Sequence, residues 1–91
     1  MASAVRDNTA LSRFELRADG ITAVANYQLA GKVMTFTHTE VPPDARHRGI
    51  ASRLIEGALA EARARGFKIV PRCSFVRDYL NAHPEDRDLL A

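Results

Sequence analysis

The sequence predicts an α/β (α+β) fold built on a mixed sheet: a three-stranded antiparallel meander, then a helix, a parallel strand and a C-terminal helix. Two observations support this prediction. Apolar and polar residues alternate with period two through the first half of the chain, as they do in half-exposed strands. Apolar residues then recur at helical spacing over 50–65, and the short apolar run 67–71 completes a right-handed βαβ unit.

The composition limits the classes of protein that need to be considered. The chain has 91 residues, 46% hydrophobic and 26% charged, as expected of one globular domain. Its net charge of +2 is low for a nucleic-acid binder, so no nucleic-acid partner is expected. No apolar run approaches the roughly 20 residues that span a bilayer, and no signal peptide is evident. One cysteine, Cys73, fits a reducing cytosol, so we expect a cytoplasmic protein without a membrane partner.

The first segment is small and polar. Residues 1–9 are predicted to be a flexible tail, and residues 10–91 a single domain. From Leu11 to Arg17, Phe14 and Leu16 alternate with charged residues. This alternation predicts a half-exposed strand.

Two further strands are predicted, each entered through a tight turn. Asp19-Gly20 predicts the first hairpin, because glycine adopts positive φ freely and aspartate tolerates it. The alternating run Ile21–Leu29 is followed by a second turn, Ala30-Gly31-Lys32. The third strand, Val33–Val41, is rich in β-branched and aromatic residues and ends at Pro42-Pro43. Without a bulge, one face of this third strand would carry Met34, Phe36, His38 and Glu40.

The second half of the chain alternates helix and strand. The helix is predicted from Ile50 to about Arg65, and Gly66 ends it through a left-handed cap. After the buried strand, Ser74 is the predicted N-cap of a second helix that runs from Phe75 to about Asn81.

The turn between the third strand and the first helix, Val41–Ala51, is a candidate anion site. Arg46, His47, Arg48 and Gly49 gather where a helix N-terminus offers unpaired N–H groups and a partial positive charge. Gly49 would let a phosphate approach the backbone closely. The alternative is a solvated basic turn.

The same turn carries a family signature. Arg46-His47-Arg48-Gly49-Ile50-Ala51 matches the pattern (Gln/Arg)-x-x-Gly-x-(Gly/Ala) of the GNAT N-acetyltransferase superfamily. With His38–Pro42, Val70–Val76 and His83-Pro84-Glu85, the chain resembles the short stand-alone acetyltransferase-like domains of that superfamily over about residues 10–91.

The resemblance implies an N-acetyltransferase that uses acetyl-CoA and an amine acceptor that the sequence does not identify. The alternative is a non-catalytic acetyl-CoA-binding module, a sensor or a partner subunit. The resemblance implies that the pantetheine arm pairs with the strand at Thr39, Glu40 and Val41, and that Cys73 lies near the thioester. The diphosphate would lie on the backbone of Arg46, His47, Arg48, Gly49, Ile50 and Ala51.

Candidate catalytic residues lie on both sides of this turn. Glu40 is the predicted base, with His38 second because its pKa is near neutral; the alternative is two exposed strand residues. The resemblance also implies Tyr79 as the candidate acid for the departing thiolate, with core packing as the alternative. Cys73 precedes a helix start, which lowers a thiol pKa, so its candidate roles are a nucleophile or a wall of the cofactor slot; the alternative is a small buried hydrophobic residue.

Two further expectations concern metals and assembly. Cys73 and His83 are too few ligands for a metal site and lack zinc-site spacing, so no metal is expected. Exposed sheet edges leave a homodimer open.

Overall fold

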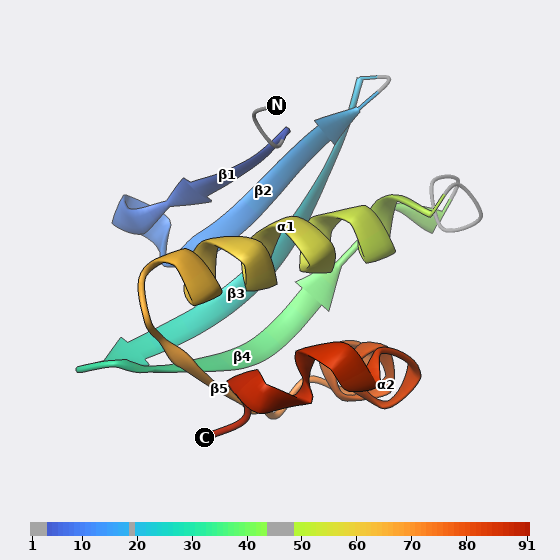
Figure 1. Cartoon of the computed structure of the whole chain (residues 1–91). Coiled ribbons are helices and arrows are strands. Elements are labelled where there is room, and N and C mark those ends of the chain that lie inside the picture. The colour runs from blue at the N-terminus through green and yellow to red at the C-terminus, as the bar shows by residue number, and fades with distance from the viewer. Residues whose placement is uncertain (1–3, 19, 44–48) are drawn as a thin grey trace.

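The computed structural model describes residues 4–18, 20–43 and 49–91. Within these ranges it contains one five-stranded sheet with the strand order β1-β2-β3-β4-β5, and helices packed on it (Figure 1). The elements are β1 (Val5–Asn8), η1 (Thr9–Leu11), β2 (Arg13–Ala18), β3 (Ile21–Ala30), β4 (Val33–Glu40), α1 (Ile50–Ala64), β5 (Lys68–Pro71), α2 (Ser74–Ala82) and η3 (Pro84–Leu89). The predicted mixed sheet is confirmed.

The sequence predicts a flexible tail over residues 1–9, and the strand β1 corrects this prediction over Val5–Asn8, while residues 1–3 lie outside the described residues. Val5–Asn8 pairs antiparallel with β2. The side chain of Asp7 fixes this strand, because Tyr27 Oη donates a hydrogen bond to its Oδ1 at 2.6 Å. On its other oxygen, Oδ2, Asp7 accepts a hydrogen bond from Arg65 Nη1 at 2.9 Å. A polar segment can therefore be ordered when the fold supplies partners for its side chains.

The predicted meander of β2, β3 and β4 is confirmed. β2 begins at Arg13 rather than Leu11, because Thr9–Leu11 forms a 3-10 turn instead. The pair Ala18↔Ile21 frames the first hairpin, where Gly20 has φ 74. Such positive φ angles are strained for residues with a Cβ, which explains the glycine.

The predicted parallel pairing of β4 and β5, which α1 connects, is also confirmed. The pairing ends before β4 does. The register runs from Val33↔Lys68 to Phe36↔Pro71. The carbonyl oxygen of Phe36 then accepts two hydrogen bonds, from the N–H groups of Arg72 and Cys73, each at 3.0 Å. Beyond Phe36, β4 continues without β5 beside it, so the two strands part at this point.

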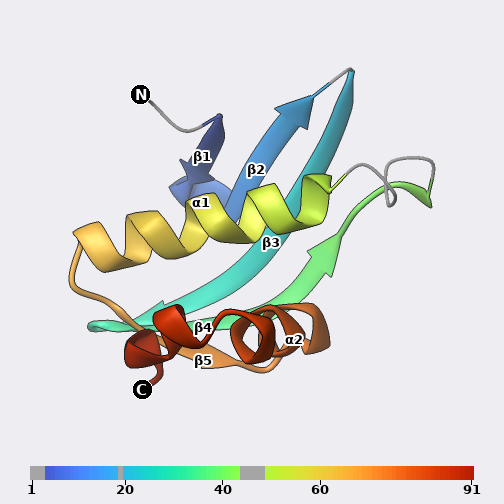
Figure 2. The same cartoon turned by 45° about the vertical axis from the view of Figure 1, so that its right-hand side comes forward.

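The described helices α1, α2 and η3 pack on the same face of the sheet (Figures 1 and 2). The buried side chains of the strands point to that face and meet the apolar stripes of α1 and α2 in one core. The largest fully buried side chains are Phe14, Phe36, Leu16, Met34, Ile50, Leu54, Ile55, Ile69 and Val76. The opposite face, which we call the open face, has no described helix on it. In the described part of the chain, none of the helices has the length and apolar character needed to cross a membrane.

Candidate functional site

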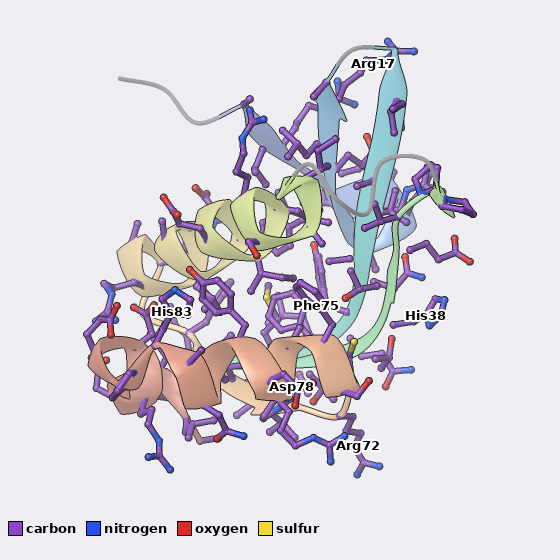
Figure 3. The ribbon with its side chains drawn as sticks, turned by 90° about the vertical axis from the view of Figure 1, so that its right-hand side faces the viewer. Arg17, His38, Arg72, Phe75, Asp78 and His83 are labelled. Atoms are coloured by element: carbon purple, nitrogen blue, oxygen red, sulfur yellow. The ribbon has the colours of Figure 1, made fainter. Side chains whose placement is uncertain are left out.

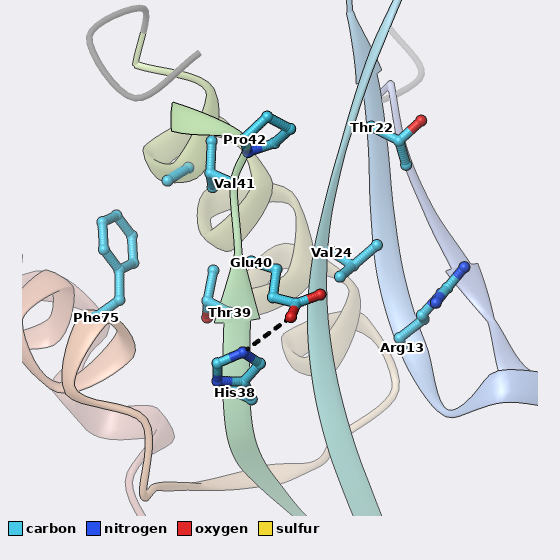
Figure 4. A pocket seen from close by; sticks show the side chains of 10 residues that line it. Arg13, Thr22, Val24, His38, Thr39, Glu40, Val41, Pro42 and Phe75 are labelled. Carbon is cyan, nitrogen blue, oxygen red and sulfur yellow. Dashed lines mark ion pairs between the residues drawn. The ribbon is translucent and has the colours of Figure 1, made fainter. Parts of the chain in front are cut away.

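A groove of about 770 Å³ surrounds the second half of β4 (Figure 4). Its walls come from both faces of the sheet, because β5 no longer covers the edge of β4 there. The lining residues are Arg13, Thr22, Val24, His38, Thr39, Glu40, Val41, Pro42, Ala51 and Phe75.

A β-bulge in β4 decides which side chains face which side of this groove. Tyr27 pairs with Phe36, but the preceding residue of β3, Asn26, pairs with His38. Thr37 is therefore the extra residue on β4, and the side-chain alternation shifts by one beyond it.

The shift corrects the prediction that Met34, Phe36, His38 and Glu40 share one face. That prediction holds for Met34 and Phe36, which are both fully buried in the core. His38 and Glu40 instead project from the open face, and Thr39 takes the helix-facing side. In Figure 4, His38 and Glu40 lie on one side of β4, and Phe75 lies on the other.

Thr39 and Cys73 are brought into contact by this arrangement. Thr39 Oγ1 lies 3.2 Å from Cys73 Sγ, although the two residues are 34 positions apart in the chain. Cys73, rather than the predicted Ser74, is the N-cap of α2, which begins at Ser74, and Cys73 is only 9% exposed. Cys73, which is predicted to be a wall of the cofactor slot, thus contacts Thr39 on β4.

The surroundings of Cys73 act on its thiol in opposite directions. Burial raises the pKa, because it disfavours the charged thiolate. The hydrogen bond to Thr39, together with backbone N–H groups of Val76, Phe75 and Thr39, favours the thiolate. The net result is a pKa below the ordinary value of a cysteine. The expected effect of a helix start on this thiol is therefore present.

Glu40 and His38 form a pair on the open side of the groove. His38 Nε2 lies 3.3 Å from Glu40 Oε1, and their side chains are 60% and 67% exposed. Both groups can exchange protons with a bound molecule or with water. Glu40 therefore does not share a side of the strand with Cys73.

Tyr79 lies away from the groove lining. Its ring is 7% exposed and stacks on the His83 ring, with centroids 3.9 Å apart. His83 Nδ1 lies 2.8 Å from the Tyr79 carbonyl oxygen, so a protonated Nδ1 donates to it. Burial raises the Tyr79 pKa, and the negative charges of Glu56, Asp86 and Glu85 raise it further. The phenol therefore keeps its proton at neutral pH, as an acid must.

The start of α1 carries part of the predicted anion site. Arg46, His47 and Arg48 lie outside the described residues. Gly49 is the N-cap of α1, is exposed and has φ 68. Ile50 is buried in the core, so only its backbone is available to a ligand, whereas Ala51 lines the groove.

The sequence did not indicate several groove residues. Arg13, Thr22 and Val24 come from β2 and β3 and lie far from the signature in the chain. Phe75 lies in the first turn of α2 (Figure 3), which follows the N-cap Cys73, and lines the groove. Their spacing carries no signal, because only the register of the sheet and the bulge bring them together. In the described ranges, no three His, Cys, Asp or Glu side chains are grouped so that they could hold a metal ion.

Comparisons with known proteins extend over almost all of these elements. A family model described as GCN5-related N-acetyl-transferase matches residues 13–89. Protein NATD1 of Mus musculus is 33% identical over 75 residues, which cover 79% of this chain and 68% of NATD1. The solution NMR structure of a GCN5-like protein from Staphylococcus aureus superposes with a TM-score of 0.73 at 20% identity, covering 100% of this chain and 91% of that one. The structural match shows a shared fold.

Proposed function

The chain belongs to the GCN5-related N-acetyltransferase family, and we propose that it binds acetyl-CoA and transfers the acetyl group to a primary amine. One observation carries the proposal: β4 and β5 part beyond Phe36, and Thr39 and Cys73 line the helix-facing side of the strand that is left. On the other side of the strand, His38 and Glu40 face the groove. A donor and an acceptor therefore have separate approaches to the same stretch of β4.

The start of α1 suits the diphosphate of acetyl-CoA. The helix has 15 residues, no acidic residue in its first turn and no side-chain hydrogen bond at its cap. Its first backbone N–H groups and its dipole therefore face outward without a competing carboxylate. A Cβ placed on Gly49 would meet nothing within 4 Å, so the space for a close approach exists.

The edge of β4 beyond Phe36 suits the pantetheine arm. The arm carries amide groups, and an edge that no described strand pairs with is where an amide-bearing chain can extend a β-ladder. Thr39, Glu40 and Val41, the predicted contacts of the arm, all line the groove. Phe75 and Ala51 add apolar surface beside them.

The proposed chemistry is direct transfer. The acceptor reaches β4 from the open face as an ammonium, and Glu40 removes a proton directly or through one water. The amine nitrogen then forms a bond to the thioester carbonyl carbon, the C–S bond breaks, and the thiolate of CoA takes up a proton. The products are an N-acetyl amine and CoA, with the proton of the ammonium released to solvent through Glu40.

Cys73 and Tyr79 have proposed roles on the helix-facing side. The lowered thiol pKa supports Cys73 as a nucleophile that carries the acetyl group in a two-step variant. In the direct scheme Cys73 is a wall of the slot. Tyr79 keeps its proton and is the proposed donor to the departing thiolate, although its ring is buried and stacks on the His83 ring.

Acetyl-CoA binding is tested with two glycines at opposite ends of α1. Gly49 and Gly66 both have positive φ, at 68° and 73°, and neither would bring a Cβ within 4 Å of another atom. Substitution by alanine strains both positions by roughly 1–2 kcal/mol. Gly49→Ala should weaken acetyl-CoA binding in calorimetry about tenfold or more, and Gly66→Ala should leave it unchanged.

Turnover is tested by CoA release with a panel of small amines and peptides. The transferase is supported by acetyl-CoA-dependent release of CoA that requires an amine. Tight acetyl-CoA binding without release for any acceptor would instead support a non-catalytic binding module. An equal loss of acetyl-CoA binding in both glycine variants would contradict the proposal that the start of α1 binds the diphosphate.

A further inference from the structure

We propose that the open face of the sheet beside β4 is the acceptor site, and that the acceptor is a primary amine that also carries a carboxylate, which Arg13 binds. The inference rests on the proposed transferase function and names the class of its second substrate. It assigns Arg13 as a specificity-determining residue.

The register of the sheet places two rows of side chains across the open face, and each row has an ionisable group on β2 and another on β4. One row contains Arg13, Asn26 and His38 on β2, β3 and β4. The next row contains Glu15, Val24 and Glu40. The groove therefore has a basic group at its β2 side and a carboxylate–imidazole pair at its β4 side.

Val24 forms an apolar floor between these two sides. It is only 8% exposed, although it is not part of the main core and no described helix covers its face. Such a floor with charged groups at its ends is typical of a site for a small polar molecule with an apolar middle.

A hydrogen bond to Glu15 fixes the position of the Arg13 side chain and leaves its Nη groups as donors for a ligand. Its Nε donates to Glu15 Oε2 at 2.7 Å, and Asn8 Nδ2 donates to the same oxygen at 3.1 Å. These hydrogen bonds, with the nearby positive charges, lower the Glu15 pKa despite some burial, so Glu15 stays ionised and anchors Arg13. The Nη groups of Arg13 have no other hydrogen-bond partner in the described part of the chain. A guanidinium with free Nη groups binds a carboxylate well.

The width of the face indicates how far apart the two groups of the acceptor are. Arg13 and His38 belong to one row and are two strands apart, which separates their backbones by about 10 Å. Both side chains reach into the groove from its ends. The ammonium and the carboxylate should then be several bonds apart, as in a dipeptide or an ω-amino acid.

The charge of the open face argues against a polyamine. The described residues that the register places on it include the basic Arg6, Arg13 and Arg17 and the acidic Glu15 and Glu40. Arginines exceed carboxylates, so a second ammonium group would meet repulsion near β2. A carboxylate would meet attraction at the same place.

The test compares the dipeptide Ala-Ala with its C-terminal amide, which has the same amine and no carboxylate. Binding to the acetyl-CoA-loaded protein is followed by backbone amide shifts on β3 and β4. The free acid should bind more tightly than the amide. Arg13→Gln should weaken free-acid binding about tenfold or more and leave amide binding unchanged. In turnover, the same variant should raise KM for the free acid without changing kcat.

Arg77→Gln is the matched control, because Arg77 is an exposed arginine on α2, away from the groove. It removes the same charge and should change the affinity for neither the free acid nor the amide. A folded Arg13→Gln variant that binds both peptides as the wild type does would overturn the proposal, as would equal wild-type affinity for acid and amide. Arg13-dependent binding without acetylation would support the acceptor site and count against the transferase function. Failure of the acceptor-site proposal can therefore be distinguished from failure of the proposed transferase function.

Discussion

Thr39 Oγ1 lies 3.2 Å from Cys73 Sγ and joins β4 to the start of α2 at the place where β4 and β5 part. The contact exists because Thr37 is an extra residue in β4. Without that bulge, Thr39 would face the open side and Glu40 would face Cys73. One inserted residue therefore assigns the thiol and the carboxylate to different sides of the strand.

Thr39→Val should raise the pKa of Cys73. The threonine hydroxyl stabilises the thiolate, and valine has nearly the same shape without the donor. The rate of alkylation by a small thiol reagent, measured against pH, should reach its midpoint at a higher pH in the variant. Thr35→Val, a similar change on the open side of β4, should leave the midpoint where it is. If the midpoint did not move with Thr39→Val, the hydroxyl of Thr39 would not stabilise the thiolate.

Tyr27→Phe should lower the free energy of unfolding by about 1.5–3 kcal/mol, the range for hydrogen bonds to charged groups. Its hydroxyl donates to Asp7 at 2.6 Å and ties β1 to the core. The loss can be measured by urea denaturation, with faster amide exchange in Val5–Asn8. Tyr79→Phe is the control, because within the described residues the Tyr79 hydroxyl has no hydrogen-bond partner. Equal losses in the two variants would contradict the role of Asp7.

The same tyrosine should make stability depend on pH at the alkaline end. Burial raises the Tyr27 pKa to about 12, assisted by the hydrogen bond to Asp7 and its charge. An unfolded tyrosine titrates near 10. The stabilisation of the protonated form is therefore complete below about pH 10 and is lost as the pH rises through 12. The difference in unfolding free energy between wild type and Tyr27→Phe should shrink across this window. A constant difference from pH 9 to 12 would contradict the raised pKa.

The fold could be predicted where local chemistry decides it. The alternation around Phe14 and Leu16 and the turn at Gly31 each act within a few residues, and the structure confirms them. The apolar stripe of α1 is equally local. The turn that is predicted to bind CoA stays a prediction from its residue types, because its basic residues lie outside the described ranges.

The site could be predicted only in part, because two features depend on partners distant in sequence. β1 is ordered by Tyr27 and Arg65, and nothing in Val5–Asn8 itself distinguishes it from a solvated tail. The bulge at Thr37 is a matter of register between two strands, and the side-chain pattern of β4 fits either register. The faces of His38 and Glu40 therefore could not be derived from the spacing.

Glu40→Gln should lower kcat for amine acetylation about 10²-fold or more, because general-base catalysis typically contributes that much. The substitution keeps the shape of the side chain and removes its ability to take a proton. It should leave acetyl-CoA affinity unchanged, because the proposed ladder with the pantetheine arm uses the backbone of Glu40, while its side chain projects from the open face, opposite Thr39 and Cys73. Steady-state kinetics with a saturating amine and calorimetry with acetyl-CoA measure the two effects separately.

Glu61→Gln is the control for this change, because Glu61 is an exposed carboxylate near the far end of α1 that pairs with Arg65. It should alter neither kcat nor acetyl-CoA affinity. If Glu40→Gln retained wild-type kcat while His38→Gln lost it, the proton would be taken by His38. The bulge would then serve to present the imidazole, with Glu40 at 3.3 Å orienting it.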